Sequence, residues 1–209
     1  MRLKYQHRLA SAAVALVLAG LLAWPAAGLA QLASTTPTVV GDASAVQATV
    51  LGFLGTATTT VLADTGSLGG TTDARDASQL TGSVPSLLAG EALSTATIGY
   101  PDHVDSEASL TSLNLTVAGI GISADSVMSR ASQVLGAAGS GNSTISGLSI
   151  NGTTIVVTGD PNQTVAIPGG QLIINEQQVS PSGITVNALH VIVNGVADVV
   201  IASATAGIS

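Results

Sequence analysis

The stretch Ile184–Ala206, ITVNALHVIVNGVADVVIASATA, decides the fold class of this chain. Val, Ile and Ala dominate it, and a single Asn-Gly pair, Asn194-Gly195, interrupts it. Asn-Gly is the strongest short signal of a β-hairpin, because both central residues of a type I′ turn need a positive φ. We therefore predict two long antiparallel strands, Ile184–Val193 and Val199–Ala206, joined across Asn194-Gly195.

The same pattern of strands and turns continues upstream. In Ser112–Val117 polar and apolar residues alternate, which is typical of a strand with one buried face. Asn151-Gly152 and Pro168-Gly169 each separate two short apolar runs, and they suit a type I′ and a type II turn, respectively. The chain is therefore predicted to be all-β, an antiparallel sandwich or roll, with an irregular β-solenoid as the alternative.

Part of the hairpin sequence recurs at unequal spacing. The strand Ser112–Val117 precedes Ala124-Asp125, and the strand Ala188–Val193 precedes Ala197-Asp198. A fainter copy ends in Ala63-Asp64. The unequal spacing disfavours a regular solenoid and favours pseudo-repeated hairpins.

The repeat alignment also bears on His190, which matches Asn114 on the outward face of its strand. Asn is a poor general base, so a position shared by Asn and His indicates a structural role. We expect His190 to have neither a carboxylate partner nor a nucleophile, and His190→Asn to cost less than about 1.5 kcal/mol.

The N-terminal 30 residues have the layout of a secretory signal peptide. Basic residues begin it, an apolar run Leu9–Trp24 follows, and small residues precede Gln31. We predict cleavage after Ala30 and export to the extracellular space or the cell surface, with no membrane attachment after cleavage.

Beyond the signal peptide we expect a flexible lead-in, residues 31–43, and a single β-rich domain, residues 44–209. Two stretches of small residues within the domain fit the strand pattern poorly. We expect Gly66–Ser106, with a short helical turn at Ser86–Leu93, and Leu135–Ser143 to be surface excursions.

Charge and composition exclude several classes of protein. Beyond residue 30 the chain has two basic residues, Arg75 and Arg130, against 12 acidic ones, which leaves a net charge of −10. A nucleic-acid binder needs clustered Lys and Arg, so no nucleic-acid partner is expected. The chain has no cysteine, which excludes disulfides, a cysteine nucleophile and thiolate metal sites.

One string in the chain suggests catalysis. Ala63-Asp64-Thr65-Gly66 matches the active-site loop of aspartic proteases, in which two such loops pair their carboxylates. The nearest second candidate, Asp125, is not followed by the required glycine. A Ser-His-Asp triad around His103 or His190 would need a nucleophile elbow, Gly-x-Ser-x-Gly, which the sequence lacks. We therefore predict no catalytic residues and assign Asp64 to a turn.

An acidic group beside Pro101 is the candidate metal site. Asp102, Asp105 and Glu107 lie within six residues, and Ca²⁺ binds six to eight oxygen ligands. The spacing does not match an EF-hand loop, so we expect a solvated acidic loop, with Ca²⁺ as the candidate ligand and no other cofactor.

The C-terminal sequence is similar to one protein family. Thr185–Val191 followed by Ala197–Ala204 resembles the C-terminal signature of the choice-of-anchor P family. The likeness covers about residues 43–207. It implies an exported bacterial protein and no established activity. Further segments that carry the resemblance are Ala63–Gly66, Ser83–Pro85, Ile122–Asp125, Ile150–Gly152, Ile167–Gly170 and Leu172–Gln177.

Together these observations predict a non-catalytic secreted or cell-surface β-module with a structural or adhesive role and an extracellular-matrix or surface partner. Two other functions remain open: a secreted hydrolase built on Asp64, and an ice- or mineral-binding β-protein, which the Ser and Thr content favours.

Overall fold

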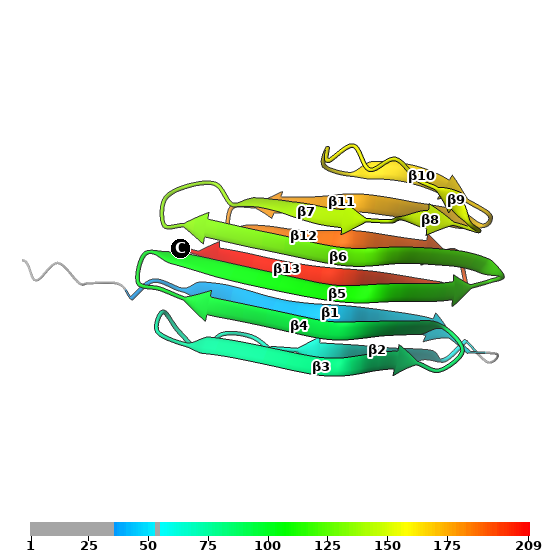
Figure 1. The fold of residues 1–209 in the computed structure, drawn as a ribbon. Coiled ribbons are helices and arrows are strands. Elements are labelled where there is room, and N and C mark those ends of the chain that lie inside the picture. Colours follow the sequence, from blue (N-terminus) through cyan, green and yellow to red (C-terminus); the bar gives the residue numbers. More distant parts are fainter. Residues whose placement is uncertain (1–35, 53–54) are drawn as a thin grey trace, which may run out of the picture. The chain divides into compact units, whose positions relative to one another are not determined.

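The computed structural model describes residues 36–52 and 55–209. The predicted signal peptide and residues 31–35 of the predicted flexible lead-in lie outside these residues. Residues 39–43, also predicted as lead-in, belong instead to strand β1 (Val39–Leu51). In the described part all regular elements are β-strands, and they form two antiparallel sheets that pack face to face (Figure 1). This confirms the predicted antiparallel sandwich. No helix in the described residues is long and apolar enough to cross a membrane.

Sheet A has six strands in the order β10-β11-β12-β13-β1-β2. The predicted hairpin is β12–β13, in which Val193 pairs with Ala197. Strand β1 pairs along most of its length with β13, so that Val39 lies opposite Ile208. The strand bounds are β1 (Val39–Leu51), β2 (Ala57–Asp64), β10 (Gln163–Ile167), β11 (Gly170–Ser180), β12 (Gly183–Val193) and β13 (Ala197–Ile208).

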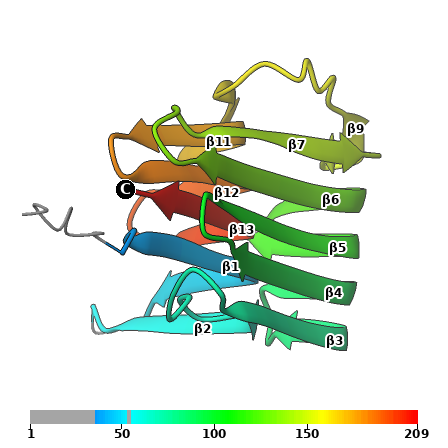
Figure 2. The same ribbon diagram turned by 90° about the vertical axis from the view of Figure 1, so that its left-hand side faces the viewer.

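Sheet B has seven strands in the order β3-β4-β5-β6-β8-β9, and β7 also pairs with β6. Figure 2, turned by 90°, shows the two sheets as separate layers. The turn Asn151-Gly152 joins β8 to β9, and both of its residues have a positive φ, as a type I′ turn requires. The strand bounds are β3 (Ala74–Val84), β4 (Leu88–Gly99), β5 (His103–Val117), β6 (Ile120–Val134), β7 (Ser140–Ser146), β8 (Ser149–Ile150) and β9 (Thr153–Thr154).

The prediction of two surface excursions and a helical turn at Ser86–Leu93 was wrong. The first stretch contains β3 and β4, the second leads into β7, and Ser86 lies in the turn between β3 and β4. The apolar alternation is hidden because several inward positions of β4, among them Gly90 and Thr95, carry small or polar side chains. Small inward residues let the sheets approach closely, but they leave no hydrophobic pattern in the sequence.

Several strands of sheet A change phase at one transverse row of residues, which we call the seam. Ala63, Ala45, Ala202, Ala188 and Asn175 lie next to one another across β2, β1, β13, β12 and β11. Ala63, Ala202 and Asn175 have φ values of 47°, 52° and 53°, in the left-handed region. A left-handed residue interrupts the pleat, so the side-chain alternation inverts at this row. Two consecutive residues therefore point inward, as Ile201 and Ala202 do in β13.

Sheet B has a matching seam with the opposite effect. Ala92 and Ser112, with φ values of 45° and 52°, lie within β4 and β5, and the pairing of these strands shifts there. Two consecutive residues then point outward, as Thr111 and Ser112 do. Non-glycine residues in the left-handed region cost about 1–2 kcal/mol each, so the seams store strain that the rest of the sandwich must offset.

The core lies between the sheets and has two hydrophobic clusters. Polar side chains also bridge the sheets: Ser106 Oγ donates to the Thr205 carbonyl at 2.6 Å, and Gln177 Nε2 donates to the Gly141 carbonyl at 3.0 Å. These bonds satisfy buried polar groups and fix the offset of one sheet relative to the other. The largest fully buried side chains are Leu93, Leu110, Leu113, Leu115, Ile122, Leu148, Leu172, Ile174, Ile184, Leu189 and Ile201.

Candidate functional site

His190, on the outer face of sheet A, lies between two carboxylates. Its Nδ1 is 2.9 Å from Glu176 Oε2, and its Nε2 is 2.9 Å from Asp198 Oδ1. The side chains of His190 and Glu176 are 14% and 13% exposed, whereas that of Asp198 is 57% exposed. The expectation that His190 has no carboxylate partner was therefore wrong.

The reason for this error is the order of the strands. Glu176 lies on β11 and Asp198 on β13, the two neighbours of β12 in sheet A. His190 and Asn114 occupy matching positions in the two sequence copies, but their partners come from neighbouring strands. A match within one strand carries no information about the residues on the neighbouring strands. The outward orientation of both residues is confirmed, but their surroundings differ.

Two further side chains complete a hydrogen-bonded network around the histidine. Asn187 Nδ2 donates to Glu176 Oε2 at 2.6 Å, and Ser203 Oγ donates to Asn187 Oδ1 at 2.7 Å. We call Glu176, Asn187, His190, Asp198 and Ser203 the His190 centre. Each bond orients the next group, so the five side chains form one connected hydrogen-bonded network.

The seam of sheet A makes this arrangement possible. In a regular strand Asn187 and His190 would point to opposite faces, because side chains alternate with a period of two. Ala188 and Leu189 both point inward at the seam, which places Asn187 and His190 on the same outer face. The sequence contains a signal of this arrangement, since the apolar alternation of Ile184–Val193 breaks at Ala188-Leu189.

Three residues of the His190 centre, Asn187, His190 and Asp198, line a depression of about 350 Å³. Six of its seven lining residues carry carboxylate, amide, hydroxyl or imidazole groups, which offer both donors and acceptors to a ligand. The residues that line the depression are Gln47, Thr49, Gln178, Asn187, His190, Asp198 and Val200.

The partners of His190 bear on catalysis. In a Ser-His-Asp triad one ring nitrogen bonds a carboxylate and the other bonds the nucleophilic hydroxyl. At His190 the second ring nitrogen, Nε2, contacts the Asp198 carboxylate instead of a hydroxyl. The nearby hydroxyls have other partners in the described part of the chain: Ser203 bonds Asn187, and Thr49 Oγ1 lies 2.9 Å from Thr59 Oγ1. Among the described residues no hydroxyl is thus positioned on His190 in the way that a Ser-His-Asp triad requires.

The loop that resembles an aspartic protease site has a turn geometry. Asp64 Oδ1 accepts a hydrogen bond from the Gly66 amide at 3.0 Å, and Thr65 Oγ1 accepts one from the Ala43 amide at 3.0 Å. Asp125, the second candidate carboxylate, lies on β6 in the other sheet. Burial and, second, the negative charge of Asp64 raise the pKa of Asp42 above its usual value.

The acidic group proposed as a Ca²⁺ site is only partly a loop. Asp102 lies in a turn, and Asp105 and Glu107 lie on β5. Asp102 Oδ1 is 2.7 Å from His103 Nδ1, and Glu107 Oε2 accepts a bond from Arg130 Nε at 2.7 Å. The hydrogen bond from His103 lowers the pKa of Asp102. Residues 36–52 and 55–209 contain no group of three or more His, Asp or Glu side chains arranged to hold a metal ion.

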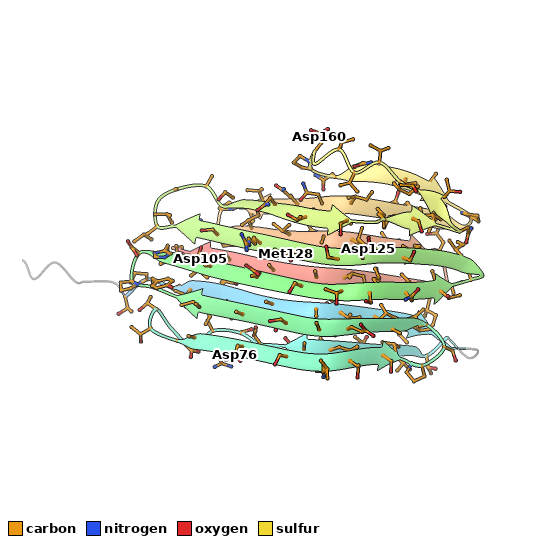
Figure 3. The ribbon with its side chains drawn as sticks, in the orientation of Figure 1. Asp76, Asp105, Asp125, Met128 and Asp160 are labelled. Carbon is orange, nitrogen blue, oxygen red and sulfur yellow. The ribbon has the colours of Figure 1, made fainter. Side chains whose placement is uncertain are left out.

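The outer face of sheet B carries short hydroxyl side chains and a wider hollow of about 660 Å³. Two pairs of its hydroxyls bond each other, Ser123 with Ser149 at 2.9 Å and Ser126 with Ser146 at 2.8 Å. Figure 3 shows Asp105, Asp125 and Met128 on this face. These side chains interrupt the hydroxyl rows, so the face lacks the uniform spacing that a match to a crystal lattice would need.

Comparisons with protein-family models, with curated proteins and with solved structures found no match to this chain. The resemblance to the choice-of-anchor P family stays a prediction, and the His190 centre is interpreted from its geometry.

Proposed function

We propose that this chain is an exported, non-catalytic β-sandwich module that attaches to a glycan-bearing surface through the His190 centre. The observation that supports this function is the polar depression of sheet A. It is lined by a histidine whose two ring nitrogens contact carboxylates and, in the described residues, no hydroxyl. The predicted signal peptide and the likeness to exported proteins agree with an extracellular role.

The chemistry of the depression suits a ligand with several hydroxyl or amino groups. Asp198, Gln178 and Gln47 present planar groups that can bond neighbouring hydroxyls of a sugar ring. With a net charge of −10 beyond residue 30, the chain repels polyanions. A neutral glycan or an amino sugar is therefore the ligand class that we propose.

A single site of this kind binds weakly. Stacking on aromatic rings usually supplies much of the affinity for flat ligands. The described residues include one Phe, Tyr or Trp side chain, Tyr100, which stacks on His103 in sheet B. We expect a Kd in the millimolar range for one site, which corresponds to about −4 kcal/mol.

The proposal is tested by co-sedimentation with chitin, chitosan, cellulose and, as a polyanion, alginate beads. We expect the chain to bind at least one of the first three polymers and not alginate. Gln178→Ala and Asp198→Ala should weaken binding, because both side chains line the depression and are exposed.

The matched control is Gln171→Ala, on the same strand as Gln178 but outside the depression. This variant should bind like the unmodified chain. Binding that is unaffected by Gln178→Ala and Asp198→Ala, or binding to alginate alone, would contradict the proposal. Hydrolysis of any of the polymers, measured as released reducing ends, would contradict the non-catalytic assignment.

A further inference from the structure

One side of the sandwich ends in two strands that have free edges. Strand β3 is the last strand of sheet B, and β2 is the last strand of sheet A. Both lie at the lower side of Figures 1 and 2, one in each layer. An edge strand presents a row of unpaired N–H and C=O groups, which can pair with a strand of another molecule.

The edge of β3 has few of the features that normally prevent such pairing. It is 11 residues long, and its two charged residues, Arg75 and Asp76, both lie near its start. Leu80, near the middle of the strand, is 85% exposed, the highest value among the large apolar residues described. Natural edge strands are usually shorter, or carry lysine, proline or an inward-pointing charge.

The opposite side of the sandwich is protected in comparison. Sheet A ends there in β10, which has five residues, and sheet B ends in β9, which has two, and in β7, which has seven and pairs only with β6. The Gln163 side chain of β10 donates to the Val156 carbonyl at 2.7 Å and accepts a bond from the Thr158 amide at 2.9 Å, which holds segment 155–162 beside the strand. Among the described residues the edge of β3 is therefore the longest strand edge that has no partner.

We propose that two copies of this chain form a symmetric dimer in which β3 pairs with β3 of the second copy. Antiparallel pairing of identical strands places one residue on the two-fold axis. With Leu80 on the axis, residues 76–84 of the two strands face each other, and Ser78 lies opposite Gly82. The two exposed leucines then contact each other across the axis, which buries the most exposed apolar residue of the edge.

The second layer supports the same axis. The two-fold axis of an antiparallel strand pair is perpendicular to the sheet, so it passes through both layers of the sandwich. In the other layer Leu62 of β2 packs over Gly82, and Val61 beside it is 41% exposed. The dimer would therefore bring the β2 edges together beneath the β3 pair and extend both sheets at once.

The axis also fixes the direction of the binding faces. Rotation about an axis perpendicular to the sheets keeps each face on its own side, so both His190 centres point the same way. If the proposed function holds, a dimer can attach to one surface through two weak sites, which raises the effective affinity by a factor of about 10²–10⁴. The dimer itself rests only on the edge of β3.

The test is the molar mass in solution, by size-exclusion chromatography with light scattering. We expect the chain to have twice its monomer mass, and Leu80→Lys to weaken dimerisation at least tenfold, because like charges would lie directly opposite each other. An equimolar mixture of Leu80→Lys and Leu80→Glu should recover the dimer. Val156→Lys is the control, since Val156 is 77% exposed but lies away from β3, and it should stay dimeric.

A second readout uses the absence of cysteine from the chain. Leu80→Cys should form a disulfide-linked dimer on mild oxidation, whereas Val156→Cys should not do so at the same rate. The proposal is overturned if the unmodified chain stays monomeric up to about 1 mM. It is also overturned if a dimer forms that Leu80→Lys does not weaken. These outcomes concern the mass alone, so they are independent of glycan binding.

Discussion

Replacement of His190 by Asn is the most informative single change in the His190 centre. The imidazole lies between Glu176 Oε2 and Asp198 Oδ1, at 2.9 Å from each. An Asn side chain is shorter and cannot reach both carboxylates. The variant therefore removes a hydrogen-bond donor from a carboxylate that is only 13% exposed, and leaves the apolar face of the strand unchanged.

The expected magnitude follows from the two bonds that are lost. A hydrogen bond to a charged group contributes about 1.5–3 kcal/mol. Glu176 keeps the bond from Asn187, so a value near the lower end applies to it. Asp198 is mostly exposed, and its contact contributes at most about 0.5–1 kcal/mol. We expect His190→Asn to reduce the free energy of unfolding by about 2 kcal/mol. This exceeds the limit of about 1.5 kcal/mol that the sequence alone suggested.

Urea denaturation followed by circular dichroism measures this change, and thermal unfolding provides a second value. For a domain of this size a loss of about 2 kcal/mol lowers the melting temperature by about 4–8 °C. Asp198→Asn is the matched control, because it removes the exposed partner only, and it should cost less than about 1 kcal/mol.

A double-mutant cycle of His190→Asn and Glu176→Gln isolates the buried contact. Residues in one hydrogen-bond network show a coupling of about 0.5–3 kcal/mol, and we expect about 1 kcal/mol here. A loss below about 0.5 kcal/mol for His190→Asn, together with additive effects in the cycle, would refute the interpretation of Glu176 and His190 as a stabilising pair.

Two further substitutions, and the N-terminus of the exported protein, test other predictions. Burial and the charge of Asp64 raise the pKa of Asp42, so its ionised form is disfavoured in the folded chain. Asp42→Asn should therefore raise the free energy of unfolding at pH 7. At about pH 3 the carboxyl is mostly protonated in both states, so the substitution should leave the free energy of unfolding nearly unchanged, as urea titrations at the two pH values would show. Gly147 has a φ of 64°, and an added Cβ would collide with the carboxylate of Asp125, so Gly147→Ala should cost about 1–2 kcal/mol in the same assay; a neutral effect would contradict the assigned backbone. N-terminal sequencing of the exported protein should begin at Gln31, and a membrane-bound product that keeps Met1 would disprove the predicted cleavage.

The parts of the fold that the sequence predicted are those in which local signals agree with tertiary packing. Asn151-Gly152 and Asn194-Gly195 mark real hairpin turns, and in Ser112–Val117 the alternation of buried and exposed residues is the one predicted. At these places turn chemistry and hydrophobic period indicate the same structure, and no distant contact overrides them.

Prediction from the sequence failed where the structure departs from a regular alternation of inward and outward side chains. Strand β4 has small or polar residues at inward positions, and the seams invert the alternation of most long strands. A search for alternating apolar residues that assumes one unbroken period along a strand loses the pattern wherever the alternation inverts. The pairing of His190 with Glu176 depends on the order of the strands in the sheet, which no local pattern encodes.

The ladder between β1 and β13 has a consequence for folding and for protein engineering. Thr38 and Ser209 exchange backbone hydrogen bonds of 2.8 and 3.0 Å. Strands β1 and β13, from the two ends of the domain, thus lie side by side within sheet A. Pairing them closes the longest loop in the domain, and such non-local pairing is slow to form. A circular permutant that joins Ser209 to Thr38 by a short linker, and opens the chain at Asn151-Gly152, would turn this pairing into a local hairpin. The permutant should keep the sandwich and fold faster than the natural order of strands allows.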